Sequence, residues 1–205
     1  LMAQISELPG EFVLRFMTSH PKDASRKLFD TMASHEKIAK QFHLPFQSGN
    51  DRILREMNRR YTAAQYLELI RYGREKMPEI VFTSDVIVGF PGETEAEFED
   101  TLRLIETVRF DALFTFIYSP RPGTPAAKMP DPFPRADKNR RFDRLLEAQN
   151  RISLEKHQAY IGKTCRVLLD GTDKDLLTGR TDGGRLVRLP GDPALIGQFC
   201  DVRIT

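Results

Sequence analysis

The sequence predicts an α/β protein, in which helices connect the strands of a parallel sheet, followed by a small all-β unit. Short apolar strands alternate with amphipathic helices at intervals of roughly 30 to 40 residues. A long amphipathic helix follows the last of these strands. Beyond Gly162 the sequence changes to short β-rich runs separated by glycine turns. The 205 residues are 40% hydrophobic and 29% charged, which suits one core and a smaller second one.

Four segments rich in β-branched and aromatic residues are expected to form the strands. They are residues 12–16, 38–44, 80–88 and 112–118. Helical connections between them imply parallel pairing with right-handed crossovers. The alternation fits an α/β barrel or an open doubly wound sheet, and because four strands cannot close a barrel, we expect the missing strands to lie upstream of Leu1.

Helices are expected between these strands. The first spans residues 23–33. The second starts at Thr62, which forms a capping box with Gln65, and the third starts at Thr94, which forms one with Glu97. Local hydrogen bonding therefore indicates where two of the helices begin.

The predicted elements divide the chain into three parts. Residues 1–134 form the sheet and its helices and end in a proline-rich loop. Residues 135–160 form a connecting helix, and residues 161–205 form a small β domain.

Composition excludes several classes of protein. No segment approaches the roughly 18 consecutive apolar residues of a membrane helix, and no leader pattern is present, so we expect a cytoplasmic protein without a membrane partner. Cys165 and Cys200 lie far apart without ligand spacing, so neither a disulfide framework nor a metal site is expected. We expect His20 and His43 to be hydrogen-bonded loop residues rather than metal ligands.

Charge is uneven along the chain, although the net charge is only +2. Residues 78–111 carry nine acidic and two basic residues, whereas residues 50–76 and 135–160 each carry seven basic and four acidic. We expect one acidic face and mildly basic faces elsewhere, which a polyanion would approach. The alternative interpretation is ordinary solvated helix surfaces.

An unusual loop follows each expected strand, in residues 18–21, 43–50, 85–93 and 119–125. The carboxyl ends of parallel strands form the functional rim of an α/β barrel. Each loop mixes small residues, which let a ligand approach the backbone, with polar residues that fix its orientation. Taken alone, residues 89–94 are better explained as a tight turn that begins a helix.

Five motifs in order along the chain resemble the methylthiotransferase branch of the radical S-adenosylmethionine enzymes. They are RFMTSHP at 15–21, HLPFQSGNDRIL at 43–54, MNRRY at 57–61, SDVIVGFPGET at 84–94 and FIYSPRPGTPA at 116–126. The terminal β unit resembles the TRAM domain, which this family uses to hold RNA. The resemblance implies the C-terminal part of a radical SAM partial TIM barrel followed by a small TRAM barrel.

The resemblance also implies S-adenosylmethionine and two [4Fe-4S] clusters as cofactors of the full-length enzyme. The family's N-terminal domain with three cysteines and its CxxxCxxC loop are not found in this sequence. Without these thiolates there is no ligand set for a cluster. We therefore expect the chain alone to bind neither cluster, to carry no catalytic residue and to be inactive.

Motif positions imply a set of cofactor contacts at the strand ends: Gln47, Ser48, Ile87, Gly89, Phe116 and Tyr118, with Thr18 and Ser19 as weaker candidates. Gln47 and Ser48 would hydrogen-bond the ribose or methionine end of the cofactor. Ile87 would pack against the adenine, and Gly89 would admit it closely. Phe116 and Tyr118 share the inward parity of the last strand and would complete this wall.

Basic and hydroxyl side chains are candidates for RNA contact: Arg59, Arg60, Arg121 and Thr124 near the rim, and Lys163, Arg180, Arg185 and Arg188 in the β unit. Binding should then depend on salt. For Arg59 and Arg60, a solvated helix end is an equal alternative.

Within the family, one branch modifies isopentenylated adenosine next to the anticodon of tRNA, and another modifies an aspartate of a ribosomal protein. The basic hairpin after Gly179 and the run Arg59-Arg-Tyr61 favour the tRNA branch. Its expected partners are the anticodon stem-loop and an electron donor, and the oligomeric state stays open. A non-catalytic RNA-binding module is a further alternative, but an inert scaffold would have no need for the rim loops.

Overall fold

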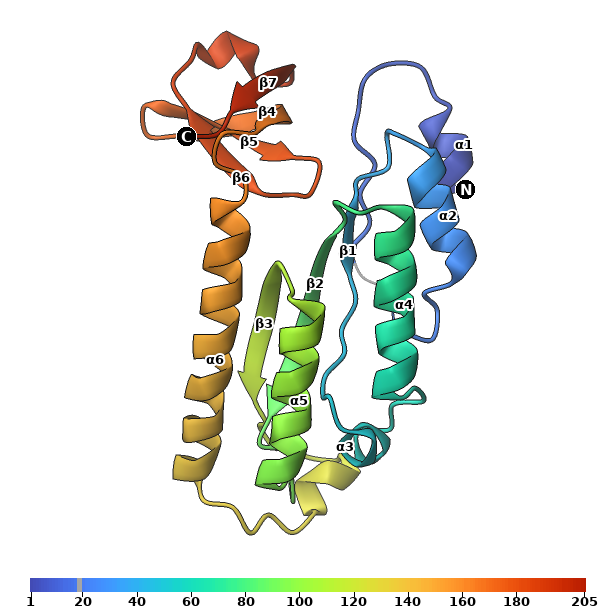
Figure 1. Cartoon of the computed structure of the whole chain (residues 1–205), viewed down its shortest axis with the longest axis vertical. Helices are drawn as coiled ribbons and strands as arrows, with labels where there is room; N and C mark the ends of the chain where they lie inside the picture. The colour runs from blue at the N-terminus through green and yellow to red at the C-terminus, as the bar shows by residue number, and fades with distance from the viewer. Residues whose placement is uncertain (18–19) are drawn as a thin grey trace.

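The structure, a computed structural model, describes residues 1–17 and 20–205. A parallel sheet covered by helices on one face forms the larger unit, and a four-stranded antiparallel sheet forms the smaller one. The helix α6 (Arg135–Gln158) runs along the larger unit and ends at the smaller one (Figure 1). The chain therefore consists of an α/β unit, a long helix and a small β domain.

The parallel sheet consists of β1 (Gln41–His43), β2 (Val81–Val88) and β3 (Ala112–Ile117) in that order. The segment predicted as a strand at 12–16 forms only one bridge, between Leu14 and Ile38, so this prediction is wrong for most of its length. Arg15 instead directs its guanidinium to carbonyl groups of the β domain.

Several helices connect and accompany the strands of this unit (Figure 1). Their bounds are α1 (Met2–Ser6), α2 (Arg26–Ser34), α3 (Asp51–Glu56), α4 (Ala63–Lys76), α5 (Glu95–Val108) and the short 3-10 helix η1 (Pro125–Lys128). Both predicted capping boxes, at Thr62 and Thr94, are confirmed. The short helices α1 and α3 have no counterpart in the prediction.

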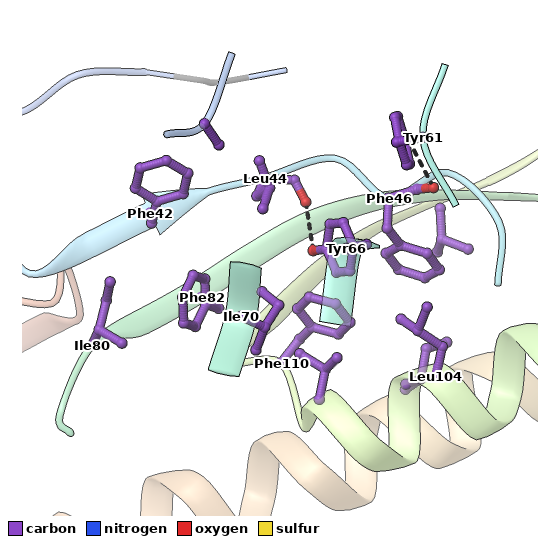
Figure 2. Packing of buried hydrophobic residues seen from close by; sticks show 14 of the residues in the cluster. Phe42, Leu44, Phe46, Tyr61, Tyr66, Ile70, Ile80, Phe82, Leu104 and Phe110 are labelled. Carbon is purple, nitrogen blue, oxygen red and sulfur yellow. Dashed lines mark hydrogen bonds between the residues drawn. The ribbon is translucent and has the colours of Figure 1, made fainter. Parts of the chain in front are cut away.

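Aromatic residues fill the core between the sheet and the helices (Figure 2). Phe46 and Phe110 stack with ring centroids 5.3 Å apart, and Phe42 and Phe82 are fully buried in the same cluster. The hydroxyl of Tyr66 donates to the Leu44 carbonyl at 2.8 Å, which satisfies the polar atom of a buried ring. Burial of each such ring contributes about 1.5–3 kcal/mol, so this side of the sheet is firmly anchored.

The opposite side of the sheet, here called the open face, carries His43, Asp85, Ile87, Phe114 and Phe116. These residues alternate along the strands with those that face the helices, and neighbouring strands bring them into register. Phe114 is 58% exposed and Phe116 is 52% exposed. Apolar side chains of this size on a sheet surface mark a surface that something else covers.

The acidic surface predicted for residues 78–111 does not stand alone, because α6 covers the acidic face of α5. Arg144 pairs with Glu95 at 2.6 Å and also with Glu99, while Arg151 pairs with Glu106. The acidic and basic segments of the sequence thus neutralise each other between two helices.

The β domain is a sheet in the order β6-β5-β4-β7, with all pairs antiparallel. Its elements are β4 (Thr164–Asp173), β5 (Leu176–Thr181), β6 (Leu186–Leu189), β7 (Phe199–Arg203) and the 3-10 helix η2 (Pro193–Leu195). Cys165 and Cys200 are free, half-buried and packed against its small core. Among the described residues, no helix is both long and apolar enough to cross a membrane.

Candidate functional site

The loop after β1 pairs with the carboxyl-terminal half of β2 at the end of the sheet, here called the rim. The Gln47 amide donates to the Asp85 carbonyl at 2.9 Å, and the Ile87 amide donates to the Gln47 carbonyl at 3.0 Å. Ile87 is also in register with Phe116 on β3. The structure therefore brings three of the predicted cofactor contacts together: Gln47, Ile87 and Phe116.

Gln47 has the left-handed backbone conformation, with φ of 64°. Such a conformation costs a residue with a Cβ about 1–2 kcal/mol. Gln47 is 7% exposed, and within the described part of the chain only its main chain is hydrogen-bonded. A strained residue that holds a polar amide without an internal partner is typical of a ligand contact.

Ser48 occupies a different environment from its neighbour. It is 1% exposed, its Oγ accepts from the Asn50 amide at 3.2 Å, and Thr101 Oγ1 on α5 lies 3.4 Å away. A Cβ on Gly49 would lie 2.5 Å from the Asp100 carbonyl oxygen. This placement does not support the predicted cofactor contact of Ser48, which instead fixes the loop against α5.

Packing and backbone conformation explain why position 89 is a glycine, and neither could be seen in the sequence. Its φ is 69°, and an added Cβ would lie 2.7 Å from Cδ of Lys138, so the Lys138 side chain fills the space that was assigned to adenine. The Gly89 amide donates to Oε2 of the fully buried Glu93 at 2.7 Å. Burial raises the pKa of Glu93 to about 7.

Phe116 and Tyr118, the two aromatic residues at the end of β3, lie in different environments. Phe116 lies on the open face beside Ile87, as predicted from its parity. Tyr118 packs its ring edge-on against Phe90, with centroids 5.2 Å apart, and its buried hydroxyl has no partner within residues 1–17 and 20–205. Thr18 and Ser19, the weaker candidates, lie outside the described residues.

A histidine and an aspartate on the open face were not predicted as a pair. His43 Nε2 lies 3.3 Å from Asp85 Oδ1, and His43 Nδ1 lies 2.9 Å from the Thr83 hydroxyl. The prediction that His43 is hydrogen-bonded is confirmed, but it lies on β1 and not in a loop. His43 and Asp85 stand at positions of neighbouring strands whose side chains face the same side of the sheet, and this alternation could have revealed the pair.

The described residues do not fit an iron-sulfur cluster. No group of three or more His, Cys, Asp or Glu side chains in residues 1–17 and 20–205 could hold a metal ion. Cys165 and Cys200 belong to the core of the β domain, far along the chain from the rim loops.

The RNA candidates near the rim differ in how exposed they are and in what they already hydrogen-bond. Arg60 is exposed and lines a groove of about 350 Å³ between α2 and α4, together with Lys22 and Tyr61. Arg59 has a buried Nε without a partner among the described residues. The Thr124 hydroxyl donates to the carbonyl of the exposed Arg121 at 2.8 Å, so Thr124 holds the turn.

Three of the four candidates in the β domain are exposed. Lys163 lies 3.8 Å from Glu79, Arg180 lies 3.2 Å from Asp170, and Arg188 lies 2.8 Å from Asp173. Exposed pairs of this kind contribute about 0–1 kcal/mol, so a phosphate can replace the carboxylate.

Arg185 is the exception among these candidates. Its side chain is 13% exposed and donates to Asp111 at 2.8 Å, at the start of β3. The prediction that Arg185 contacts RNA is therefore corrected, because this guanidinium is already bound between the two units of the chain.

Comparison with known protein families assigns both units. The model of the radical SAM superfamily matches residues 1–105, and the model of the TRAM domain matches residues 158–205. In coproporphyrinogen III oxidase (HemN) from Escherichia coli, described as a radical SAM enzyme, 50% of the chain aligns with 86% of this one, with a TM-score of 0.56. At 14% identity this likeness shows the fold alone.

Curated relatives match along the whole chain. A tRNA-2-methylthio-N(6)-dimethylallyladenosine synthase from Acetivibrio thermocellus is 49% identical over 207 residues, which cover 100% of this chain and 43% of the relative. A synthase of the same name from Symbiobacterium thermophilum is 50% identical over 200 residues, which cover 96% of this chain and 43% of the relative. The chain thus spans less than half the length of these relatives.

Proposed function

The chain belongs to the radical SAM superfamily, and from this premise we propose that it is the C-terminal part of a tRNA methylthiotransferase. The complete enzyme would convert N6-isopentenyladenosine next to the anticodon into its 2-methylthio derivative. One observation carries the proposal: relatives named for this reaction match both units of the chain at close to half identity. This match favours the tRNA branch over the ribosomal-protein branch.

The rim suits S-adenosylmethionine. Ile87 and Phe116 form an adjacent apolar pair for the adenine, and Gln47, whose main chain pairs with β2 at Asp85 and Ile87, would offer its side-chain amide to the polar ribose or methionine end. When bound, S-adenosylmethionine supplies a carbon radical after reductive cleavage. The residues of this chain bind and orient it, and Glu93 keeps the loop at 89–93 in place through the Gly89 amide.

Replacement of Gln47 tests the cofactor site. Gln47→Gly removes the amide and tolerates the left-handed backbone, whereas Gln47→Asn keeps an amide and also tolerates it. In the complete enzyme, we expect Gln47→Gly to weaken S-adenosylmethionine binding at least tenfold and Gln47→Asn to weaken it less. Isothermal titration calorimetry measures both, and unchanged affinity in Gln47→Gly would remove Gln47 from the site.

Cluster ligands are proposed to come from the part of the complete enzyme that this chain does not include. The chain alone should then bind no iron after anaerobic reconstitution and should be inactive. Iron analysis of the reconstituted chain tests this, and a stoichiometric cluster would contradict our account of its cysteines.

The β domain and the groove beside Arg60 are proposed to hold tRNA through its phosphates. Neutralising phosphates with Lys and Arg makes affinity fall with salt, by a slope of about one per contact. We expect Arg180→Glu with Arg188→Glu to weaken binding of a labelled anticodon stem-loop and to reduce its salt slope by about two. Arg103→Glu on α5 is the control, since Arg103 is also exposed but pairs with Asp100 on the acidic helix.

Both outcomes of the binding measurement are informative. A reduced salt slope in the double variant alone places RNA on the β domain. Equal binding of all three proteins, with no dependence on salt, would remove RNA from this surface and would favour a protein substrate.

A further inference from the structure

Residues 181–185, which join β5 to β6, are here called the docking turn. The turn is closed by its own hydrogen bonds, from the Gly184 amide to the Thr181 carbonyl at 2.8 Å and from the Thr181 amide to the Arg185 carbonyl at 3.0 Å. The turn touches the amino ends of the parallel strands. These ends form the edge of the sheet opposite the rim (Figure 1). Apart from Arg15, which begins the motif at 15–21, the residues that make this contact lie outside the five family motifs.

Two glycines let the docking turn approach the sheet. A Cβ on Gly183 would lie 2.5 Å from Cγ2 of Val81, the first residue of β2. A Cβ on Gly184, whose φ is 79°, would overlap the side-chain oxygen of Gln41, the first residue of β1. Glycine at both positions leaves room for the Val81 and Gln41 side chains against the turn, and the positive φ of Gly184 also favours glycine.

Polar contacts hold the same turn from the side of β1. Arg15 donates through Nη2 to the Thr181 carbonyl at 2.8 Å and through Nη1 to the Asp182 carbonyl at 3.0 Å. The Asp182 carboxylate accepts from the Lys40 amide at 3.0 Å. Burial lowers the pKa of Arg15, although the guanidinium stays charged at every ordinary pH.

Arg185 holds the turn from the side of β3 and α6. Its Nη2 donates to Asp111 Oδ1 at 2.8 Å, and its guanidinium lies over the Tyr160 ring at 4.9 Å. The Nδ1–H of His157 donates to the Ser153 carbonyl, which leaves its Nε2 to accept from Arg185 Nη1 at 2.8 Å. The Asp111 carboxylate also accepts from the Phe82 amide at 3.0 Å, so one buried charge joins both units.

We propose that the docking turn orients the β domain, with Arg15, Asp182 and Arg185 as positioning residues. The chain between α6 and β4 passes through Gly162, whose φ is 82° and beside which no atom would meet a Cβ. Without the docking turn, the β domain would be held only by the connection at Gly162 and by exposed ion pairs such as Arg166–Glu11 and Lys163–Glu79, and it would move more freely. The turn therefore sets where RNA on the β domain lies relative to the rim, a consequence that rests on the proposed function.

The chain by itself tests the orientation. Spin labels at positions 75 on α4 and 175 at the tip of the β4–β5 hairpin, with both native cysteines replaced by serine, report the distance between the units. We expect one narrow distribution in the parent and at least a twofold wider one in Arg15→Ala/Arg185→Ala. Arg203→Ala, which removes an exposed arginine from β7, is the matched control and should leave the distribution narrow.

A second variant keeps the proposal testable in case the double variant does not fold. If circular dichroism shows that the double variant is unfolded, Gly184→Ala perturbs the same contact through one methyl group and should widen the distribution as well. A distribution that stays narrow in a folded variant would overturn the proposal.

The complete enzyme tests the consequence for the reaction. The double variant should bind tRNA with a dissociation constant within about twofold of the parent, because Arg180 and Arg188 are untouched, while its turnover should fall at least tenfold. Equal turnover despite a widened distribution would show that orientation does not matter and would overturn the positioning role. An intact enzyme that forms no product would refute the proposed function while leaving the docking result standing.

Discussion

Glu93→Gln should change how the stability of this chain depends on pH. The Glu93 side chain is fully buried and accepts the Gly89 amide at 2.7 Å, while Oε1 has no partner among the described residues. Burial raises its pKa from 4.5 to about 7. Glutamine keeps an oxygen for the Gly89 amide and cannot ionise.

The sign follows from the two pKa values. The unfolded chain releases this proton near pH 4.5, whereas the folded chain keeps it until about pH 7. Stability from Glu93 is therefore fully present below about pH 4.5 and is lost as the pH rises through 7. At about 1.4 kcal/mol for each pH unit between the two values, the loss approaches about 3 kcal/mol by pH 8.

Urea unfolding of both proteins, followed by circular dichroism at 222 nm, measures the effect. Between pH 5 and 8, the free energy of unfolding of Glu93→Gln should gain about 3 kcal/mol on that of the parent. Glu75→Gln, which replaces an exposed glutamate on α4, should run parallel to the parent. Parallel curves for Glu93→Gln as well would refute the reasoning.

Four further variants test the same region. Hydrogen bonds from Arg52 are the main reason that the pKa of Glu97 is lowered to about 2, so ionised Glu97 should stabilise the fold above pH 4.5. Glu97→Gln should therefore have a lower free energy of unfolding in urea than the parent, and this difference should vanish as the pH falls toward 2. Gly49→Ala places a methyl group 2.5 Å from the α5 backbone and should cost at least about 3 kcal/mol. Gly92→Ala meets only an unfavourable φ and should cost about 1 kcal/mol, so equal thermal unfolding of these two variants would contradict the packing argument. Gln47→Gly should raise the free energy of unfolding by about 1 kcal/mol, and a loss of stability would show that its amide supports the fold.

Features that depend on near neighbours in the chain could be predicted from the sequence. The capping boxes at Thr62 and Thr94 need only residues three positions apart, and both were confirmed. The inward parity of Phe116 follows from strand geometry alone. The motif order was specific enough to identify the family before any geometry was known.

Features that depend on distant partners could not be predicted. The acidic surface of α5 disappears because α6, about 45 residues further along the chain, supplies its counter-charges. Arg185 resembles any basic hairpin residue until the fold places Asp111 beside it. Ser48 and Gly89 were assigned to a ligand because their packing partners, Thr101 and Lys138, lie 50 or so residues away.

Mass spectrometry of tRNA nucleosides tests the central claim most directly. The complete enzyme that contains this chain is reconstituted anaerobically and incubated with S-adenosylmethionine, a reductant and tRNA that carries N6-isopentenyladenosine. We expect the 2-methylthio derivative to appear and to be absent when this chain is used alone. Cleavage of S-adenosylmethionine without any change in the nucleoside would contradict the assignment to tRNA.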